Sequence, residues 1–279
     1  MLTRRRFSFA AAGVSVLPAW AKKSKIRIGV TDWNLRLSGK VEAVAKAKEL
    51  GFAGVEISLG RKANADRLPQ DDPEIIAKYL AAFKEHGIRP AGTCLDILHT
   101  NYLKSDKLGQ KWVAEGIPLT HKLGAKVMLM PFFGRGAMKT AEELDYVGDF
   151  LKEMAPEAKK QGVTLGLENT NSAEENVRIM DRVGAPAVKV YYDVGNSTNG
   201  GYDIVKEIQW LGASRICQIH LKDNPGFMGE GKINFPQVMK VIMNLGFEGF
   251  ANLETDSPTK NVDSDMRRNL AYIGGLMNA

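Results

Sequence analysis

Short apolar segments alternate with segments of helical periodicity along almost the whole chain, and this alternation restricts the fold more than any other feature. The expected strands are residues 25–30, 53–58, 88–95, 125–130, 163–168, 187–193, 215–221 and 249–254. The expected helices are residues 40–50, 72–86, 106–123, 140–161, 172–183, 202–211, 235–245 and 261–277. Strands separated by helices pair in parallel, so eight such units predict an α/β fold, a single (β/α)8 TIM barrel, with a doubly wound open sheet as the second choice.

The first 21 residues have the pattern of an export signal. A basic cluster at residues 4–6 precedes a mildly apolar stretch, and Ala19-Trp20-Ala21 is a typical cleavage site. Residues 3–7 (TRRRF) resemble the twin-arginine signal. We therefore expect a signal peptide over 1–21, a barrel domain over 22–279 and a periplasmic or otherwise exported protein. An uncleaved anchoring N-terminus is the alternative.

Charge and composition exclude several classes of protein. The formal net charge is +6, and loss of residues 1–21 would remove three arginines and no acid, leaving +3. So small an excess does not indicate a nucleic-acid partner. No apolar run reaches the roughly 18–20 residues that cross a bilayer, so we expect no stable membrane insertion. Cys94 and Cys217 lie in different expected strands, where we expect reduced thiols. Formation of a homo-oligomer is left open.

The fifth to eighth expected strands each carry one potential metal ligand at or near the carboxyl end. These residues are Glu168, Asp193, His220 and Glu254. In a TIM barrel the carboxyl ends of the strands build the active site, so the four side chains should meet at one mouth. Taken singly, each could cap a helix, pair with a lysine or fill the core. Together, three carboxylates and an imidazole suit one divalent ion, with Mn²⁺ preferred and Mg²⁺, Co²⁺ or Zn²⁺ as alternatives.

Five segments carry a resemblance to a known family. They are GFAGVEI (51–57), LGLEN (165–169), YDVGN (192–196), IHLKD (219–223, followed by GEG at 229–231) and GFANLE (249–254). With these segments, residues 25–275 resemble the sugar phosphate isomerase/epimerase family of xylose isomerase-like TIM barrels. The resemblance implies that Glu168, Asp193, His220 and Glu254 bind one divalent metal ion. One position departs from the family, because Asn196 stands where many members have a histidine.

The resemblance also implies a reaction. We expect a metal-dependent isomerase or epimerase that removes the proton beside the carbonyl of a sugar or keto-sugar, with the metal acting as a Lewis acid. Glu168 and Glu254 come from different expected strands, so they are the candidate acid/base pair for the two faces of the substrate. The alternative is that both serve only as ligands.

Several residues beyond the proposed ligands are candidates for contact with a small-molecule sugar. They are Trp33, Glu56, His99, Asn196, Lys222, Asp223 and Glu230. Glu56 is expected to end the second strand, where it could instead pair with lysines of residues 22–25. Phe132 and Phe133, like Trp33, could form an apolar wall for a sugar face or simply pack in the core.

Two other kinds of function fit the same barrel mouth. A metal-dependent lyase or dehydratase acting on a keto-sugar or an inositol-like substrate needs the same proton abstraction, and Asn196 mildly favours it. A non-catalytic sugar-binding barrel would not need two opposed carboxylates. Endonucleases with this barrel use several histidines around three zinc ions, whereas only His99 and His220 are expected near this mouth.

Overall fold

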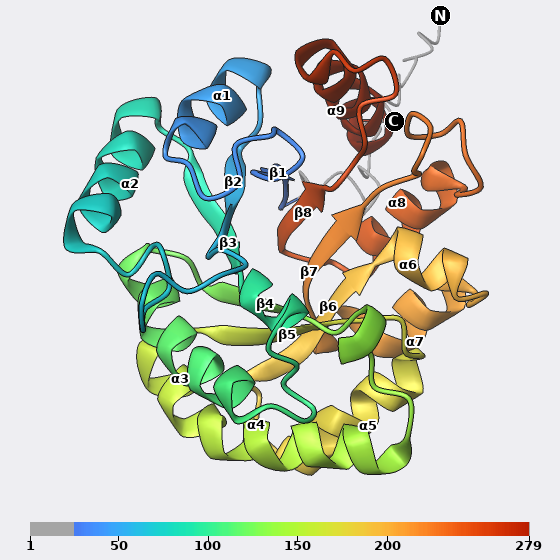
Figure 1. Ribbon diagram of the computed structural model, residues 1–279. Helices are drawn as coiled ribbons and strands as arrows, with labels where there is room; N and C mark the ends of the chain where they lie inside the picture. The colour runs from blue at the N-terminus through green and yellow to red at the C-terminus, as the bar shows by residue number, and fades with distance from the viewer. Residues whose placement is uncertain (1–24, 279) are drawn as a thin grey trace, which may run out of the picture.

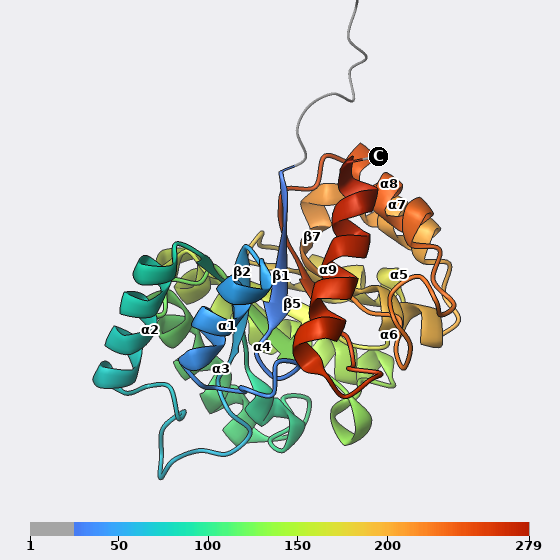
Figure 2. The ribbon, with the colours of Figure 1, turned by 90° about the horizontal axis from the view of Figure 1, so that it is seen from above.

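The protein folds as a closed barrel of eight parallel strands, in the order β1 to β8, with β8 paired back to β1. The computed structural model describes residues 25–278, and the predicted signal peptide over 1–21 lies outside the described residues. Figure 1 shows the helices forming a ring around the strands, and the view in Figure 2 shows α9 running beside β1. The predicted TIM barrel is confirmed, and the doubly wound open sheet is wrong.

The strands lie close to their predicted positions because each is a short apolar segment buried between the barrel interior and the helices. Their bounds are β1 Ile26–Thr31, β2 Gly54–Ser58, β3 Arg89–Cys94, β4 Val127–Pro131, β5 Thr164–Glu168, β6 Val188–Asp193, β7 Ile216–Leu221 and β8 Gly249–Leu253. Two register shifts interrupt the ladders, one between Val55 and Glu56 and one between Val190 and Tyr191. Such shifts re-aim the side chains that follow them, and Glu56 and Tyr191 meet inside the barrel.

The helices also follow the predicted pattern, with one short addition. Their bounds are α1 Glu42–Leu50, α2 Pro73–His86, α3 Lys107–Lys122, α4 Ala141–Gln161, α5 Ala173–Val183, α6 Val194–Asn199, α7 Ile204–Arg215, α8 Phe235–Asn244 and α9 Val262–Asn278. Ser172 begins α5 with the predicted capping box, in which Glu175 returns a hydrogen bond to the Ser172 backbone. Helix α6 was not predicted, because six residues are too few to show helical periodicity.

The buried apolar side chains form two separate clusters. The large apolar core lies between the strands and the surrounding helices, whereas a small cluster of Cys94, Val127, Leu129 and Tyr191 is separate from it. Cys94 and Cys217 are free thiols, as predicted, and burial raises the pKa of both, that of Cys217 to about 12. Within residues 25–278, no helix is both long and apolar enough to cross a membrane.

Candidate metal centre and active site

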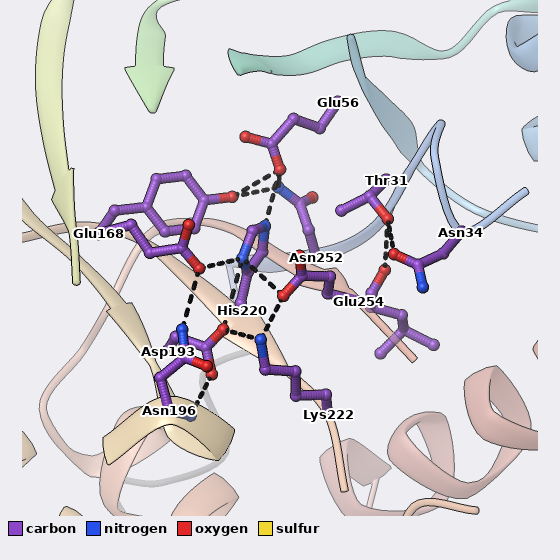
Figure 3. A network of polar contacts seen from close by, with 12 residues as sticks. Thr31, Asn34, Glu56, Glu168, Asp193, Asn196, His220, Lys222, Asn252 and Glu254 are labelled. Carbon is purple, nitrogen blue, oxygen red and sulfur yellow. Dashed lines mark hydrogen bonds and ion pairs between the residues drawn. The ribbon is translucent and has the colours of Figure 1, made fainter. Parts of the chain in front are cut away.

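Four side chains from consecutive strands converge at one end of the barrel. Glu168 ends β5, Asp193 ends β6, His220 lies in β7 and Glu254 directly follows β8. One potential ligand atom from each lies within 4.8 Å of those of the other three (Figure 3). The structure thus brings together the four residues that the sequence singled out as ligands.

The imidazole of His220 turns one nitrogen toward all three carboxylates. Its Nδ1 lies 3.0 Å from Glu168 Oε1, 3.3 Å from Glu254 Oε2 and 3.7 Å from Asp193 Oδ2. Asp193 Oδ2 is buried and has only positively charged or ionisable nitrogens close to it, Lys222 Nζ at 2.6 Å and His220 Nδ1 at 3.7 Å. Three carboxylates that converge with an imidazole nitrogen at one point fit a divalent cation that prefers oxygen and imidazole ligands.

The other ring nitrogen of His220 is held from inside the barrel by Glu56. Glu56 Oε2 lies 2.9 Å from His220 Nε2 and accepts hydrogen bonds from Tyr191 Oη at 2.8 Å and Asn252 Nδ2 at 3.1 Å (Figure 3). Gly29 leaves room for this network, because a Cβ there would lie 2.1 Å from Asn252 Oδ1. A carboxylate on Nε2–H fixes the tautomer in which the Nδ1 lone pair faces the cluster.

This arrangement corrects the expectation for Glu56. The residue lies within β2, which continues to Ser58, and its side chain is 0% exposed. It therefore does not face the substrate, and Lys25, the one lysine of residues 22–25 that the structure describes, pairs with Glu248 instead. Its role in the structure is to position His220, and two partners, Tyr191 and Asn252, position Glu56 in turn.

Replacing Glu56 with glutamine is expected to weaken Mn²⁺ binding by about 10–100-fold, the usual cost of losing a carboxylate behind a metal-ligating histidine. The variant keeps the shape of the side chain but loses the charge that holds Nε2–H. Titration calorimetry with Mn²⁺ measures the change. Glu230→Gln is the matched control, since Glu230 is exposed and pairs with Arg268. Equal Mn²⁺ affinity in both variants would contradict the positioning role.

Lys222 balances part of the negative charge of the cluster. Its Nζ lies 2.6 Å from Asp193 Oδ2 and 2.6 Å from Glu254 Oε2, and the side chain is only 14% exposed. Burial opposes its charge, but Asp193 and Glu254 outweigh burial and raise the Lys222 pKa above its ordinary value. The stem of Lys222 passes over Gly195, where a Cβ would lie 2.6 Å from its Cγ. Lys222 thus contacts the predicted ligands directly.

The two glutamates of the cluster differ in protonation. Burial raises the pKa of Glu168 to about 8, against the opposing charge of His220. Burial also disfavours the charged form of Glu254, but His220 and Lys222 together hold its pKa well below the ordinary value. Paired carboxyl groups whose pKa values are pushed apart are a common signature of an acid and a base.

Metal affinity is expected to rise steeply with pH. Burial lowers the pKa of His220, but Glu254 and Glu168 outweigh burial and raise it well above its ordinary value, so the cluster holds a proton that a metal ion must displace. A raised pKa means that the proton competes with the metal as pH falls. We expect Mn²⁺ binding to release at least one proton and to weaken about tenfold per proton for each unit below the folded-state pKa. Calorimetry in two buffers of different ionisation enthalpy counts the protons, and a count of zero would contradict this account.

A cavity of about 590 Å³ opens above the cluster, within the usual size range of ligand pockets. Trp33 lines it and donates from Nε1 to Glu254 Oε1 at 3.1 Å. Asn196 also lines it and donates from Nδ2 to Glu168 Oε1 at 3.4 Å. His99 stacks on Phe133 with ring centroids 6.2 Å apart. Each of these residues, like Lys222, lines the cavity and is therefore positioned to contact a bound substrate.

Three other candidates lie outside this cavity. The Asp223 carboxylate is 5% exposed and accepts backbone hydrogen bonds within its own loop. Glu230 is exposed and pairs with Arg268, and Phe132 is buried in the core. The expectation that Asp223 and Glu230 face the substrate is therefore corrected, and for Phe132 the alternative of packing in the core holds. Asp223 follows β7 by two residues, and the loop turns its side chain inward.

The cavity also contains residues that the sequence did not single out. They are Asn34, Ser38, Arg61, Cys94, Asp96, Pro131, Asn224 and Asp256. Most lie in the loops that follow strands, so a systematic list of such loops would have included them. Asn34 accepts a hydrogen bond from Thr31 Oγ1 (Figure 3). It also donates to the Thr255 carbonyl, which ties the loop after β1 to the segment that follows β8.

Comparisons with known proteins agree with this architecture. The chain is 26% identical over 200 residues to 2-epi-5-epi-valiolone 7-phosphate 2-epimerase from Actinoplanes, covering 71% of this chain and 73% of that protein. The structure of an L-ribulose 3-epimerase superposes with a TM-score of 0.73 at 19% identity, covering 91% and 95% of the two chains. The IOLI protein with a bound zinc atom superposes with a TM-score of 0.71 at 16% identity, covering 90% and 98%.

The named activities among these relatives are sugar epimerisations, which supports the prediction of an enzyme of the isomerase and epimerase class. The fold is the same in all of them. Residues 44–273, most of the chain, match the family described as xylose isomerase-like TIM barrel. The chain therefore belongs to the xylose isomerase-like TIM barrel family.

Proposed function

We propose that this protein is a divalent-metal-dependent epimerase or isomerase of a sugar or keto-sugar. The observation that carries the proposal is the pair Glu168 and Glu254. These carboxyl groups come from β5 and β8, face the same cavity and have pKa values displaced in opposite directions. The epimerase names of the relatives support the same class of reaction.

The proposed metal ligands are Glu168, Asp193, His220 and Glu254, with Mn²⁺ preferred and Mg²⁺, Co²⁺ or Zn²⁺ as alternatives. A divalent cation bound there supplies Lewis acidity that makes the proton beside a carbonyl more acidic. Lys222 places additional positive charge and hydrogen-bond donors beside Asp193 and Glu254.

The protein's own residues divide the proton transfer between them. His220 and Lys222 hold the pKa of Glu254 below its ordinary value, so its carboxylate is ionised and is available as the proposed acceptor of the proton. Glu168 faces the same cavity from β5, so it is the proposed group that returns a proton on the other side of the substrate. Trp33 fixes Glu254 through its indole N–H, and Asn196 contacts Glu168, so both carboxyl groups are oriented from the cavity side. General acid–base catalysis of this kind contributes about 10²–10⁴-fold.

A lyase or dehydratase is the second candidate, and the observation that favours it is Asn196. An amide at the cavity wall cannot carry a positive charge. Product analysis separates the candidates when the metal-loaded protein is incubated with a panel of ketoses and keto-glycosides. An epimerase or isomerase gives a product of unchanged mass, whereas a dehydratase gives one lighter by a water molecule. Binding without any product would favour the sugar-binding function.

We also propose that residues 1–21 direct export and that the mature protein begins at Lys22. The support is the arginine cluster, the mildly apolar stretch and the Ala19-Trp20-Ala21 site. Mass spectrometry of the protein from cell fractions tests this. An N-terminus at Lys22 in an exported fraction is expected, and an intact chain in the cytosol would contradict it.

A further inference from the structure

The loop between β7 and α8 turns its backbone donors away from the cavity and onto an internal carboxylate. Asp223 accepts hydrogen bonds from the backbone N–H groups of Gly229 at 3.2 Å, Gly231 at 2.9 Å, Lys232 at 3.0 Å and Ile233 at 3.3 Å. The close approach requires glycine, since a Cβ on Gly231 would lie 2.1 Å from Asp223 Oδ1.

Converging backbone N–H groups of this kind normally form a site for an external anion. In TIM barrels the loops after the seventh and eighth strands frequently bind a phosphate group. Here the carboxylate of Asp223 accepts all four of these hydrogen bonds, and the residue is only 5% exposed. The loop therefore offers those donors to a side chain of the protein and not to a phosphate on the substrate.

The cavity wall carries little positive charge that could bind a phosphate in place of those four N–H groups. Apart from the residues of the metal cluster, the carboxyl groups that residues 25–278 contribute to this wall are Asp96 and Asp256, and the one guanidinium they contribute is Arg61. Lys222 is held by Asp193 and Glu254. Burial lowers the pKa of His99, and the charge of Arg61 lowers it further, so the imidazole is neutral and stacks on Phe133. A neutral imidazole and an aromatic ring suit hydroxyl groups and the apolar face of a sugar.

We propose that the substrate is an uncharged carbonyl-containing sugar or glycoside, without a phosphate group. This inference rests on the proposed function for the identity of the site, and it adds the class of substrate. The reacting end faces Glu168 and Glu254, and the far end lies against His99 and Phe133. A phosphate at the far end would meet the carboxyl groups of Asp96 and Asp256 and a single arginine.

The first experiment measures solvent deuterium exchange into matched pairs such as D-fructose and D-fructose 6-phosphate, using the Mg²⁺-loaded protein. The uncharged member is expected to have a kcat/KM at least about tenfold higher, because like charges disfavour the phosphorylated member. Inorganic phosphate at millimolar concentration is expected not to compete. A phosphorylated member that reacts equally well or better would overturn the proposal, and loss of that reaction in Arg61→Ala would identify Arg61 as the phosphate contact.

The second experiment does not depend on turnover. Asp223→Ala frees the four N–H groups and is expected to lower the melting temperature by about 5 °C or more. Inorganic phosphate should restore part of that loss, while chloride at equal ionic strength should not, and wild type and the loop control Glu230→Gln should not respond to phosphate. Phosphate stabilisation of the wild type, abolished by Arg61→Ala, would overturn the proposal.

If no sugar exchanges a proton, the proposed function fails, and these melting curves still decide whether an anion site is filled by Asp223. Should Asp223→Ala not fold, the wild-type curve alone makes that decision.

Discussion

Replacing either Glu254 or Glu168 with glutamine is expected to lower the rate of proton exchange by about 10²–10⁴-fold, the contribution of a positioned acid or base. Glutamine keeps the shape and one oxygen ligand but neither accepts nor returns the proton. Glu254 should show the larger effect on proton removal, because it is the proposed acceptor of the proton, whereas Glu168 is the proposed group that returns one.

Both glutamates are also proposed ligands, so the metal content of each variant must be measured with the rate. Glu143→Gln is the control, since Glu143 lies in α4, pairs with Lys104 in the loop before α3 and does not line the cavity. A glutamine variant that retains its metal and still exchanges at the wild-type rate would show that its glutamate is a ligand only. If neither variant is slower, the barrel mouth is a binding site and not a catalytic one.

Removing the divalent ion with a chelator is expected to abolish turnover, and adding back Mn²⁺ is expected to restore it. Without the cation, the three carboxylates near His220 Nδ1 are compensated only by the imidazole and Lys222. Because the ion binds the folded state, its removal should also lower the melting temperature, by an amount that corresponds to about 4 kcal/mol at 1,000-fold saturation.

Melting curves with and without chelator, together with the activity assay, test this expectation. The control is Asp193→Asn, which removes the charge of one proposed ligand and should make the melting temperature less sensitive to Mn²⁺. A chelated protein with full activity and an unchanged melting temperature would rule out a functional metal at this cluster.

The sequence was sufficient to predict the barrel because its signals are local and repeated. Each strand is a short apolar segment, and residues such as Gly87 and Gly162 end helices in the left-handed conformation that glycine adopts readily. The same regularity placed Glu168, Asp193, His220 and Glu254 at strand ends, and hence at one mouth. Strand order alone was enough for that conclusion, without knowledge of side-chain contacts.

The role of Glu56 could not be predicted in the same way. β2 continues two residues past Glu56, and a register shift next to it turns the carboxylate into the barrel, toward His220. A register shift leaves no signal in apolar periodicity. Asp223 was misplaced for a related reason, because its environment depends on how the loop over residues 229–233 folds back.

The most direct test of the central claim is to follow deuterium from solvent into the carbon beside the carbonyl of a ketose or keto-glycoside, by mass spectrometry. The claim is that a carboxylate at the metal cluster removes this proton. We predict exchange in the Mn²⁺-loaded wild type, none after chelation, and a loss of about 10²–10⁴-fold in metal-retaining Glu254→Gln. A metal-loaded wild type that binds such a sugar in the cavity yet exchanges no proton, or exchange that persists unchanged after chelation, would contradict the account.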